Sequence, residues 1–513
     1  MKKLKFLNYD KIEPRLYQEF IAATAINKNT LCILPTGMGK TLVGVMVAAY
    51  RLEKYPKSKI LMVAPTRPLV NQHMRTFKKL MKLKESDFVA LTGKIHPSDR
   101  EVFYSKGRLF FATPQLIRND IENKILDLKN YSLVIVDECH RSVKRYAYTS
   151  VIDYYVKQSF DPLILGLTAS PGGIKDKINE VKENLRTQAV EIRTEKDGDV
   201  IPYVQEMKID RIYVELPKEL LDIRKDLKSA YEKRLEWLIH CKLIYSTKVG
   251  KRVLIDLQNK IGRMYQEKKD FMVAKALTTC AQAIKIEHAL GLLETQGITS
   301  IYRYFLDLQK NKKTAATRNV LNDPSVREAM KKTKELFVKG VEHPKLGKLT
   351  EIVGGEIKRK PNTKIIVFAN YRSSVEQITK LLEAKNIEAR EFIGQAVKKG
   401  KGLKQKEQIE ILNEFRYEIF NVLVATSVGE EGLDIEEVDL VVFYEPVPSE
   451  IRSIQRRGRT GRTRPGRVVF LITKDTRDEG YYWSAFHKEK KMQKILYHMK
   501  EVNRKKSLKD WAK

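Results

Sequence analysis

The chain has 513 residues, too many for one ordinary hydrophobic core, so we expect three domains. Lys and Arg outnumber Asp and Glu by 97 to 64, and the net charge of +33 favours a polyanionic partner. Nucleic acid is the first candidate for this partner and an anionic membrane is the second. The alternative is that the charge serves solubility or thermal stability. The four cysteines form no CxxC pair, which argues against a zinc site or a disulfide framework. No apolar stretch is long enough to cross a membrane, and the N-terminus has no apolar signal core, so we expect a cytoplasmic protein.

The pattern of apolar residues predicts an α/β protein with two parallel-sheet lobes and a mostly helical insert between them. Short, nearly continuous apolar runs are typical of strands buried on both faces of a parallel sheet. In the insert, apolar residues recur at helical spacing, Asp323 before Pro324 predicts a helix start, and Gly340 predicts a helix end. The predicted strands are 31–34, 60–64, 109–112, 133–136 and 163–167 in the first lobe, and 365–369, 422–425, 440–444 and 468–472 in the second. The predicted domains are residues 1–205 for the first lobe, 206–344 for the insert, 345–490 for the second lobe and 491–513 for a polar tail, with an exposed basic loop at 396–406.

The segment LPTGMGKT follows a predicted strand and opens a predicted helix, which is the setting of a phosphate-binding loop. Gly37 and Gly39 let the backbone curl so that its N–H groups point at phosphate oxygens. We expect Lys40 to reach the β and γ phosphates of ATP and Thr41 to hold Mg²⁺. The predicted loop residues are Leu34, Pro35, Thr36, Gly37, Met38, Gly39, Lys40 and Thr41.

The segment VIVDECH ends a predicted strand in two acids. Asp137 is predicted to bind Mg²⁺, and Glu138 to orient and deprotonate the water that attacks the γ phosphate. Ligands gather at the carboxyl ends of strands in open α/β sheets. His140 is predicted to couple the state of the nucleotide to the nucleic acid. The alternatives are solvated acids at a strand end and an ordinary surface histidine.

Two further segments complete the predicted nucleotide site. In RLYQ, Gln18 can pair with the adenine edge and Arg15 can assist, although a surface helix start is the alternative. In QRRGRTGR, Arg459 and Arg462 are predicted to contact the γ phosphate as fingers from the second lobe, and Gln455 to contact the γ phosphate or the attacking water. A basic nucleic-acid patch without catalysis is the alternative.

The segments PTGMGKT, DECH, TAS, ATSVGEEGLDI and QRRGRTGR stand in the order in which superfamily-2 helicases have them, and the chain resembles that family over nearly its whole length. The resemblance implies two RecA-like lobes that close on ATP while nucleic acid lies across both. It implies that Thr168 and Ser170 link hydrolysis to lobe movement and that Gly432 and Asp434 face the nucleotide. It also implies nucleic-acid contacts at Thr66, Arg67, Thr92, Gly93, Thr113, Asn370, Arg372, Gly394, Gln395 and Thr426.

Within this superfamily the sequence is most similar to the archaeal Hef and Fanconi-anaemia group M branch, through RLYQ, LPTGMGKT, VDECHR, GLTASPGG and QRRGRTGR. This resemblance implies repair work on branched DNA at replication forks, an insert that grips duplex as a thumb, and a nuclease domain or sliding clamp as a partner. A spacer or a protein-docking bundle is the alternative for the insert. The ERKxxxD cluster and helix–hairpin–helix motifs of such relatives are absent from these residues, so we expect no nuclease activity from them. An RNA-stimulated translocase and an ATP-gated clamp that does not unwind remain alternative functions.

Overall fold

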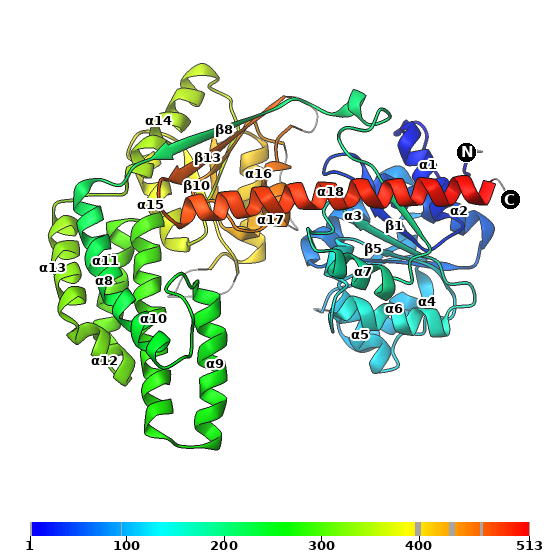
Figure 1. Ribbon diagram of the computed structural model, residues 1–513. Helices are drawn as coiled ribbons and strands as arrows, with labels where there is room; N and C mark the ends of the chain where they lie inside the picture. Colours follow the sequence, from blue (N-terminus) through cyan, green and yellow to red (C-terminus); the bar gives the residue numbers. More distant parts are fainter. Residues whose placement is uncertain (1–2, 94, 396–401, 430–436, 462–464, 512–513) are drawn as a thin grey trace.

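The computed structural model describes residues 3–93, 95–395, 402–429, 437–461 and 465–511, with side chains described up to residue 502. It contains two α/β lobes, a helical insert attached to the second lobe, and a long C-terminal helix that runs from the second lobe across the first (Figure 1). This arrangement confirms the predicted fold class. Within the described part of the chain, no helix combines the length and the apolar character that a membrane crossing requires.

The first lobe is built on a parallel sheet of seven described strands in the order β3-β4-β2-β5-β6-β1-β7. The inner strands are buried on both faces, and a separate cluster of apolar side chains covers each face, which confirms the doubly wound lobe. The strands are β1 (Thr30–Ile33), β2 (Lys59–Val63), β3 (Phe88–Ala90), β4 (Leu109–Ala112), β5 (Tyr131–Val136), β6 (Ile164–Thr168) and β7 (Ala189–Ile192). The helices are α1 (Leu16–Ala25), α2 (Lys40–Lys54), α3 (Arg67–Leu80), α4 (Pro97–Lys106), α5 (Pro114–Glu122), α6 (Ala147–Gln158) and α7 (Lys175–Asn184).

The second lobe has a parallel sheet in the order β10-β11-β9-β12-β13-β8. One of its strands comes from the range predicted for the insert, because β8 pairs with β13 along its whole length, so the boundary placed at residue 206 was wrong. The strands are β8 (Met207–Val214), β9 (Ile365–Phe368), β10 (Ala389–Phe392), β11 (Val422–Ala425), β12 (Leu440–Phe443) and β13 (Gly466–Thr473). The helices are α14 (Pro344–Arg359), α15 (Arg372–Glu383), α16 (Gln405–Arg416) and α17 (Glu450–Arg457).

The insert is helical, as its apolar spacing predicted. The Asp323 carboxylate caps α13 by accepting a hydrogen bond from the Val326 backbone N–H at 3.1 Å, and Gly340 follows the helix with a φ of +70°. Of the basic loop expected at 396–406, only 402–406 are described, and Gln405 begins α16. The helices of the insert are α8 (Lys218–His240), α9 (Lys251–Glu267), α10 (Phe271–Thr295), α11 (Ile298–Lys310), α12 (Ala315–Asn322) and α13 (Pro324–Val338).

The C-terminal residues form the long helix α18 (Arg477–Trp511), so the polar tail predicted from residue 491 was wrong. Met492 and Leu496 of α18 are buried in an apolar cluster of the first lobe, and Lys500 pairs with Asp197 there. The helix continues beyond the second lobe because its few apolar residues pack on the first lobe, and the polar composition of the segment does not predict this contact.

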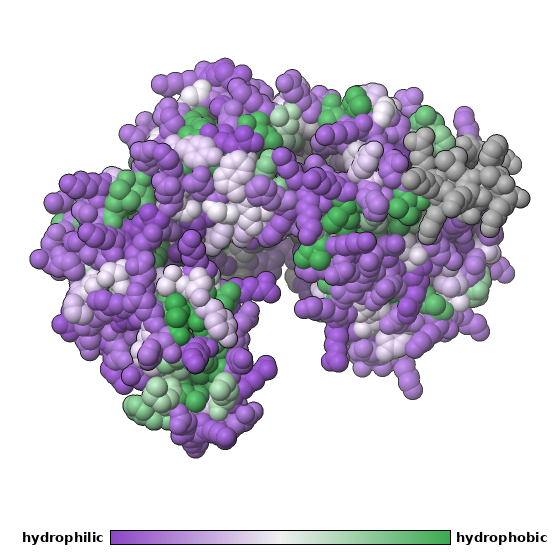
Figure 2. Space-filling view, in the orientation of Figure 1, coloured by the Kyte–Doolittle hydropathy of each residue, from purple (hydrophilic) through white to green (hydrophobic). Residues whose placement is uncertain are grey.

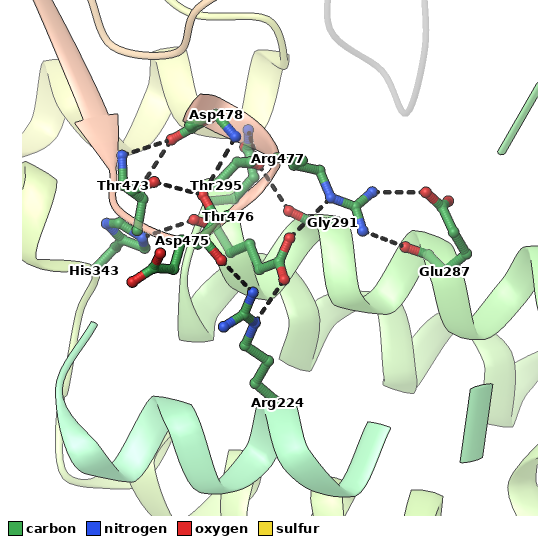
Figure 3. A network of polar contacts seen from close by, with 12 residues as sticks. Arg224, Glu287, Gly291, Thr295, His343, Thr473, Asp475, Thr476, Arg477 and Asp478 are labelled. Carbon is green, nitrogen blue, oxygen red and sulfur yellow. Dashed lines mark hydrogen bonds and ion pairs between the residues drawn. The ribbon is translucent and has the colours of Figure 1, made fainter. Parts of the chain in front are cut away.

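A network of buried charges joins the insert to the second lobe where α18 begins (Figure 3). The Arg477 guanidinium donates to Glu287 at 2.8 Å and to Glu294 at 3.0 Å, both on α10. The next residue, Asp478, pairs with Lys345 of α14 within the second lobe, and both side chains are fully buried. Because buried charges are tolerated only when they are paired, this network holds the insert and the second lobe in one arrangement.

Candidate functional site

The loop after β1 has the curled conformation that phosphate binding requires. Gly37 and Gly39 have φ angles of +81° and +76°, a region that side chains avoid. Lys40 is the first residue of α2, and its Nζ donates to the carbonyl oxygens of Leu34 at 3.1 Å and Pro35 at 3.3 Å. The loop and the first turn of α2 therefore bring backbone N–H groups, a helix N-terminus and an ammonium group together.

Helix α1 packs against this loop through two polar side chains. The Gln18 amide nitrogen donates to the Met38 carbonyl at 3.1 Å, and its amide oxygen accepts from the Arg15 backbone N–H at 2.9 Å. The Tyr17 hydroxyl donates to the same Met38 carbonyl at 2.9 Å, and the Arg15 guanidinium lies 4.1 Å from the centre of the Tyr203 ring. The predicted adenine-reading residues thus stand beside the loop, with the Gln18 amide bonded to it. Tyr17 and Tyr203 belong to this group and were missed from the sequence.

The predicted magnesium carboxylate, Asp137, is buried and paired with a histidine that the sequence analysis did not consider. Asp137 Oδ2 lies 2.7 Å from Nε2 of His73 on α3. Burial alone would raise the pKa of Asp137, but the charge and hydrogen bond of His73 and the charge of Lys40 outweigh it, and the pKa lies below its ordinary value. The carboxylate is therefore ionised at neutral pH, as a cation ligand must be.

The second acid, Glu138, is connected to the TAS segment. Its backbone adopts the left-handed conformation with a φ of +47°, which is uncommon for a residue with a side chain. Its Oε2 lies 3.3 Å from Nδ1 of His140, and that nitrogen lies 3.1 Å from the Thr168 hydroxyl. The Thr168 hydroxyl in turn accepts from the Ser170 backbone N–H at 3.2 Å. The structure thus brings the predicted coupling residues together beside Glu138.

The donor set near the phosphate loop fits a nucleotide-bound magnesium ion. Among the described residues, no three His, Cys, Asp or Glu side chains gather into a metal site of their own. Nucleotide enzymes bind Mg²⁺ through one or two carboxylates together with phosphate oxygens and water. Asp137 supplies an ionised carboxylate close enough to Lys40 for their charges to interact, and Thr41 supplies a hydroxyl next along the chain.

The arginine segment of the second lobe meets the phosphate loop of the first. Gly458, directly after α17, has so little space that a Cβ there would lie 3.0 Å from Thr36 Cβ and closer still to its hydroxyl. At the other end of α17, the Glu450 carboxylate accepts from the Gly173 backbone N–H at 3.1 Å. Helix α17 and the phosphate loop therefore face each other across the seam between the lobes.

The residues of α17 and its C-terminal turn are largely buried at this seam. Gln455 and Arg459 are 7% and 8% exposed. Arg456 is fully buried, donates to the Asn370 side-chain oxygen at 3.0 Å, and lies 4.9 Å from the centre of the Phe368 ring. Asn370, which is predicted to contact nucleic acid, thus accepts a hydrogen bond from Arg456 of α17. Three predicted residues lie outside the described ones: Gly432, Asp434 and Arg462.

The predicted nucleic-acid contacts of the first lobe gather at one sheet edge. They follow β2, β3 and β4, which are parallel and adjacent, so their carboxyl ends share an edge. Thr66 and Thr113 are the residues directly before α3 and α5. Arg67 approaches Gly93, whose missing Cβ would lie 3.4 Å from its guanidinium. The residues at this edge are Thr66, Arg67, Thr92, Gly93 and Thr113.

The predicted contacts of the second lobe gather in the corresponding place. They follow β9, β10 and β11, which are also parallel and adjacent. The Arg372 guanidinium donates to the Gly394 carbonyl at 2.9 Å, which ties two of these loops together. The residues at this edge are Asn370, Arg372, Gly394, Gln395 and Thr426.

Three family models match the chain. Residues 11–173 match the type III restriction enzyme res subunit, residues 219–340 an ATP-dependent RNA helicase helical bundle, and residues 344–464 the helicase conserved C-terminal domain. With two RecA-like lobes facing each other across a phosphate loop, the chain belongs to superfamily 2 of the helicases.

One solved structure narrows this class. The helicase domain of Hef from Pyrococcus furiosus is 44% identical, aligns with a TM-score of 0.73, and is matched over 94% of this chain and 100% of that one. The chain belongs to this Hef-type family of helicases, as the sequence predicted.

Curated relatives are longer than this chain. A Methanocaldococcus jannaschii protein, named as an ATP-dependent RNA helicase, is 44% identical over 95% of this chain and 61% of its own length. The ATP-dependent DNA helicase MPH1 of Pyricularia oryzae is 36% identical over 94% of this chain and 45% of its own length. The chain thus spans about half the length of the curated relatives that it matches.

Proposed function

We propose that this chain couples ATP hydrolysis to movement along DNA at branched or forked structures. The observation that supports the proposal is the seam at which α17 faces the phosphate loop, together with a row of predicted nucleic-acid contacts on the matching edge of each lobe. Hydroxyls, amides and Arg that bind phosphates hold any sequence, as a motor requires. Closing of the seam on ATP and its reopening after hydrolysis would alternate the grip of the two edges.

In this proposal the chemistry is divided between the lobes. Asp137 and Thr41 would hold Mg²⁺, which would supply positive charge that screens the phosphates of the nucleotide. Lys40 binds the β and γ phosphates, and Glu138 takes a proton from the attacking water. Arg459, together with Arg462, stabilises the charge that develops on the γ phosphate, and Gln455 orients the water or the phosphate. An arginine supplied in this way contributes on the order of 10³-fold or more to hydrolysis.

The insert supports a role on branched DNA through the hairpin of α9 and α10, which extends away from the lobes (Figure 1). A hollow separates it from the first lobe, and hydrophilic residues cover most of the visible face (Figure 2). At the hairpin tip, Phe271 and Met272 are 78% and 53% exposed and follow Lys268 and Lys269. Asp270 fixes this turn, because its carboxylate accepts from the Met272 backbone N–H at 2.7 Å. An exposed ring beside cations suits stacking on an unpaired base with phosphates nearby.

RNA is the second candidate substrate. The Methanocaldococcus jannaschii relative carries an RNA helicase name, and contacts to phosphates do not distinguish the two nucleic acids. A preference for RNA would require contacts to 2′-hydroxyl groups.

The test measures ATP hydrolysis with forked DNA, linear duplex DNA, single-stranded DNA and RNA at equal nucleotide concentration. We expect the largest stimulation by forked DNA, and strand displacement that depends on ATP. Stimulation by RNA alone would reverse the choice of substrate, and stimulation without displacement would favour a clamp. Lys40→Ala is the control for the site, and we expect it to abolish hydrolysis with every nucleic acid.

A further inference from the structure

His73 occupies an unusual position for a polar residue. Helix α3 buries one stripe, Val70, His73, Phe77 and Leu80, and His73 is its polar member. Its Nε2 meets Asp137 Oδ2 at 2.7 Å, although the two residues are 64 positions apart. They come together because α3 follows β2, Asp137 follows β5, and these parallel strands are paired with Val63 opposite Val136.

The carboxylate and the backbone of Asp137 are held by different groups. Its backbone N–H donates to the Val63 carbonyl at 2.9 Å within the sheet, and its backbone carbonyl accepts from the Tyr148 hydroxyl at 2.7 Å. The carboxylate accepts a side-chain hydrogen bond from His73, and the backbone N–H of the next residue, Glu138, also bonds to it. Since a carboxylate turns about its own bonds, the sheet bond to Val63 fixes where the Asp137 backbone lies, while His73 holds the carboxylate oxygen Oδ2.

The same helix begins at the nucleic-acid edge. Thr66 and Arg67 stand at its N-terminus, and His73 is six positions after Arg67, which is about 9 Å along a helix. Val70 and Phe77 anchor α3 in the core, so a displacement at its N-terminus is carried along the helix as a unit.

We infer that His73 is a positioning residue that connects the magnesium-side carboxylate to the helix that meets the nucleic acid. The two acids of the site then have separate connections. Glu138 is joined through His140 to Thr168, while Asp137 is joined through His73 to α3. The inference rests on the proposed roles of Asp137 and of the α3 N-terminus. Its consequence is reciprocal: nucleic acid bound at α3 changes the affinity for the magnesium–nucleotide complex, and that complex changes the affinity for nucleic acid.

The test measures binding without turnover. A fluorescent, non-hydrolysable ATP analogue is titrated at increasing Mg²⁺, with and without single-stranded DNA. We expect His73→Leu to raise the Mg²⁺ concentration for half-maximal binding about tenfold. In other metal sites, removing the residue that hydrogen-bonds to a metal ligand weakens metal binding by about this factor. We also expect DNA to lower that concentration for the wild-type chain and to leave it unchanged for His73→Leu.

Two matched variants separate positioning from simple damage. His73→Gln keeps a nitrogen donor near the place of Nε2 and is expected to restore both the Mg²⁺ dependence and the response to DNA. Tyr148→Phe removes the neighbouring bond to the Asp137 backbone and is expected to keep both. If His73→Leu does not fold, His73→Asn, whose shorter amide does not reach Asp137, replaces it.

The inference is overturned if His73→Leu, or His73→Asn in its place, binds the analogue with the wild-type Mg²⁺ dependence. It is also overturned if DNA lowers the Mg²⁺ concentration for half-maximal binding by the same factor in that variant as in the wild type. The broader proposal fails in a different way. If DNA does not affect nucleotide binding or hydrolysis by the wild-type chain, the nucleic-acid assignment itself is wrong, whatever His73 does.

Discussion

Gly458→Ala tests whether α17 and the phosphate loop form the working seam. The backbone of Gly458 has a φ of −66°, which alanine adopts without strain, so the substitution acts only through its added methyl group. That carbon would lie 3.0 Å from Thr36 Cβ and closer to its hydroxyl, whereas carbon atoms pack comfortably at about 3.5–4.0 Å. Helix α17 must therefore withdraw from the loop by roughly 0.5–1 Å.

A displacement of this size has a calculable effect on hydrolysis. Misplacing catalytic groups by about 1 Å costs on the order of 10²-fold in rate, so we expect kcat for ATP to fall by about 10- to 100-fold. In free energy this is about 1.4–2.7 kcal/mol of transition-state stabilisation. The assay is steady-state ATP hydrolysis at saturating DNA, with thermal unfolding measured on the same samples to show that the fold is intact.

A double-mutant cycle makes this prediction specific. Thr36→Gly removes the two nearest atoms that the new methyl group would meet and leaves only the Ile454 backbone oxygen at 3.2 Å, so Gly458→Ala should cost much less activity on that background. Gly355→Ala is the matched control, because a Cβ there meets open space, and we expect wild-type kcat. An unchanged kcat for Gly458→Ala, or a full loss that persists beside Thr36→Gly, would refute the reasoning about the seam.

Three further predictions concern the insert, its attachment and a buried pair of the second lobe. Burial lowers the pKa of His343 to about 3, and its neutral ring donates to a carbonyl of α10 and accepts from the Lys345 backbone N–H. The contribution of His343 to stability is present above the pKa of about 6.5 that it has in the unfolded chain, and it is lost as the pH falls toward 3. When the pH is lowered from 7.5 to 5, the free energy of unfolding in urea should therefore fall by about 2 kcal/mol more for the wild type than for His343→Asn. Lys345→Met leaves the buried Asp478 unpaired and should cost about 3–5 kcal/mol, and a loss below about 1 kcal/mol would contradict a buried pair. Phe271→Ala should weaken fork unwinding several-fold but not the ATPase activity stimulated by single-stranded DNA. Tyr245→Ala, in the loop between α8 and α9 and 94% exposed, should change neither.

The strands that were predicted and those that were missed differ in their place in the sheet. Every strand predicted from apolar runs is internal, with a neighbour on each side. The missed strands, β3, β7, β8 and β10, are the four edges of the two described sheets. An internal strand of a parallel sheet is covered on both faces and is continuously apolar, whereas an edge strand is partly open to water. Strand β8 shows the consequence, since no residue of it is fully buried.

In the candidate site, the parts formed by one continuous segment were predicted from the sequence, whereas contacts between distant segments were not. The phosphate loop is one continuous segment, so the sequence alone predicted that Lys40 opens a helix. The pairing of His73 with Asp137 joins segments 64 residues apart, and no motif around either residue predicts the contact. One signal was present: His73 falls at helical spacing between Val70 and Phe77, and a polar residue in a buried stripe needs a partner.

The two seams of the molecule differ in strength, and this difference decides which parts can move. The seam between the insert and the second lobe contains the largely buried pairs of Arg477 with Glu287 and Glu294 (Figure 3), and breaking a buried pair costs about 3–5 kcal/mol. Across the contact with the first lobe, the charge pair of Lys500 with Asp197 is partly open to water, and such pairs contribute about 1 kcal/mol or less. The other contact of α18 there is apolar, through Met492 and Leu496, and fixes no single geometry as a buried charge pair does. We therefore expect the insert and the second lobe to move as one body against the first lobe. Nucleic acid held by the insert would then be carried with the second lobe, so that each closure of the seam over ATP becomes a displacement along the strand.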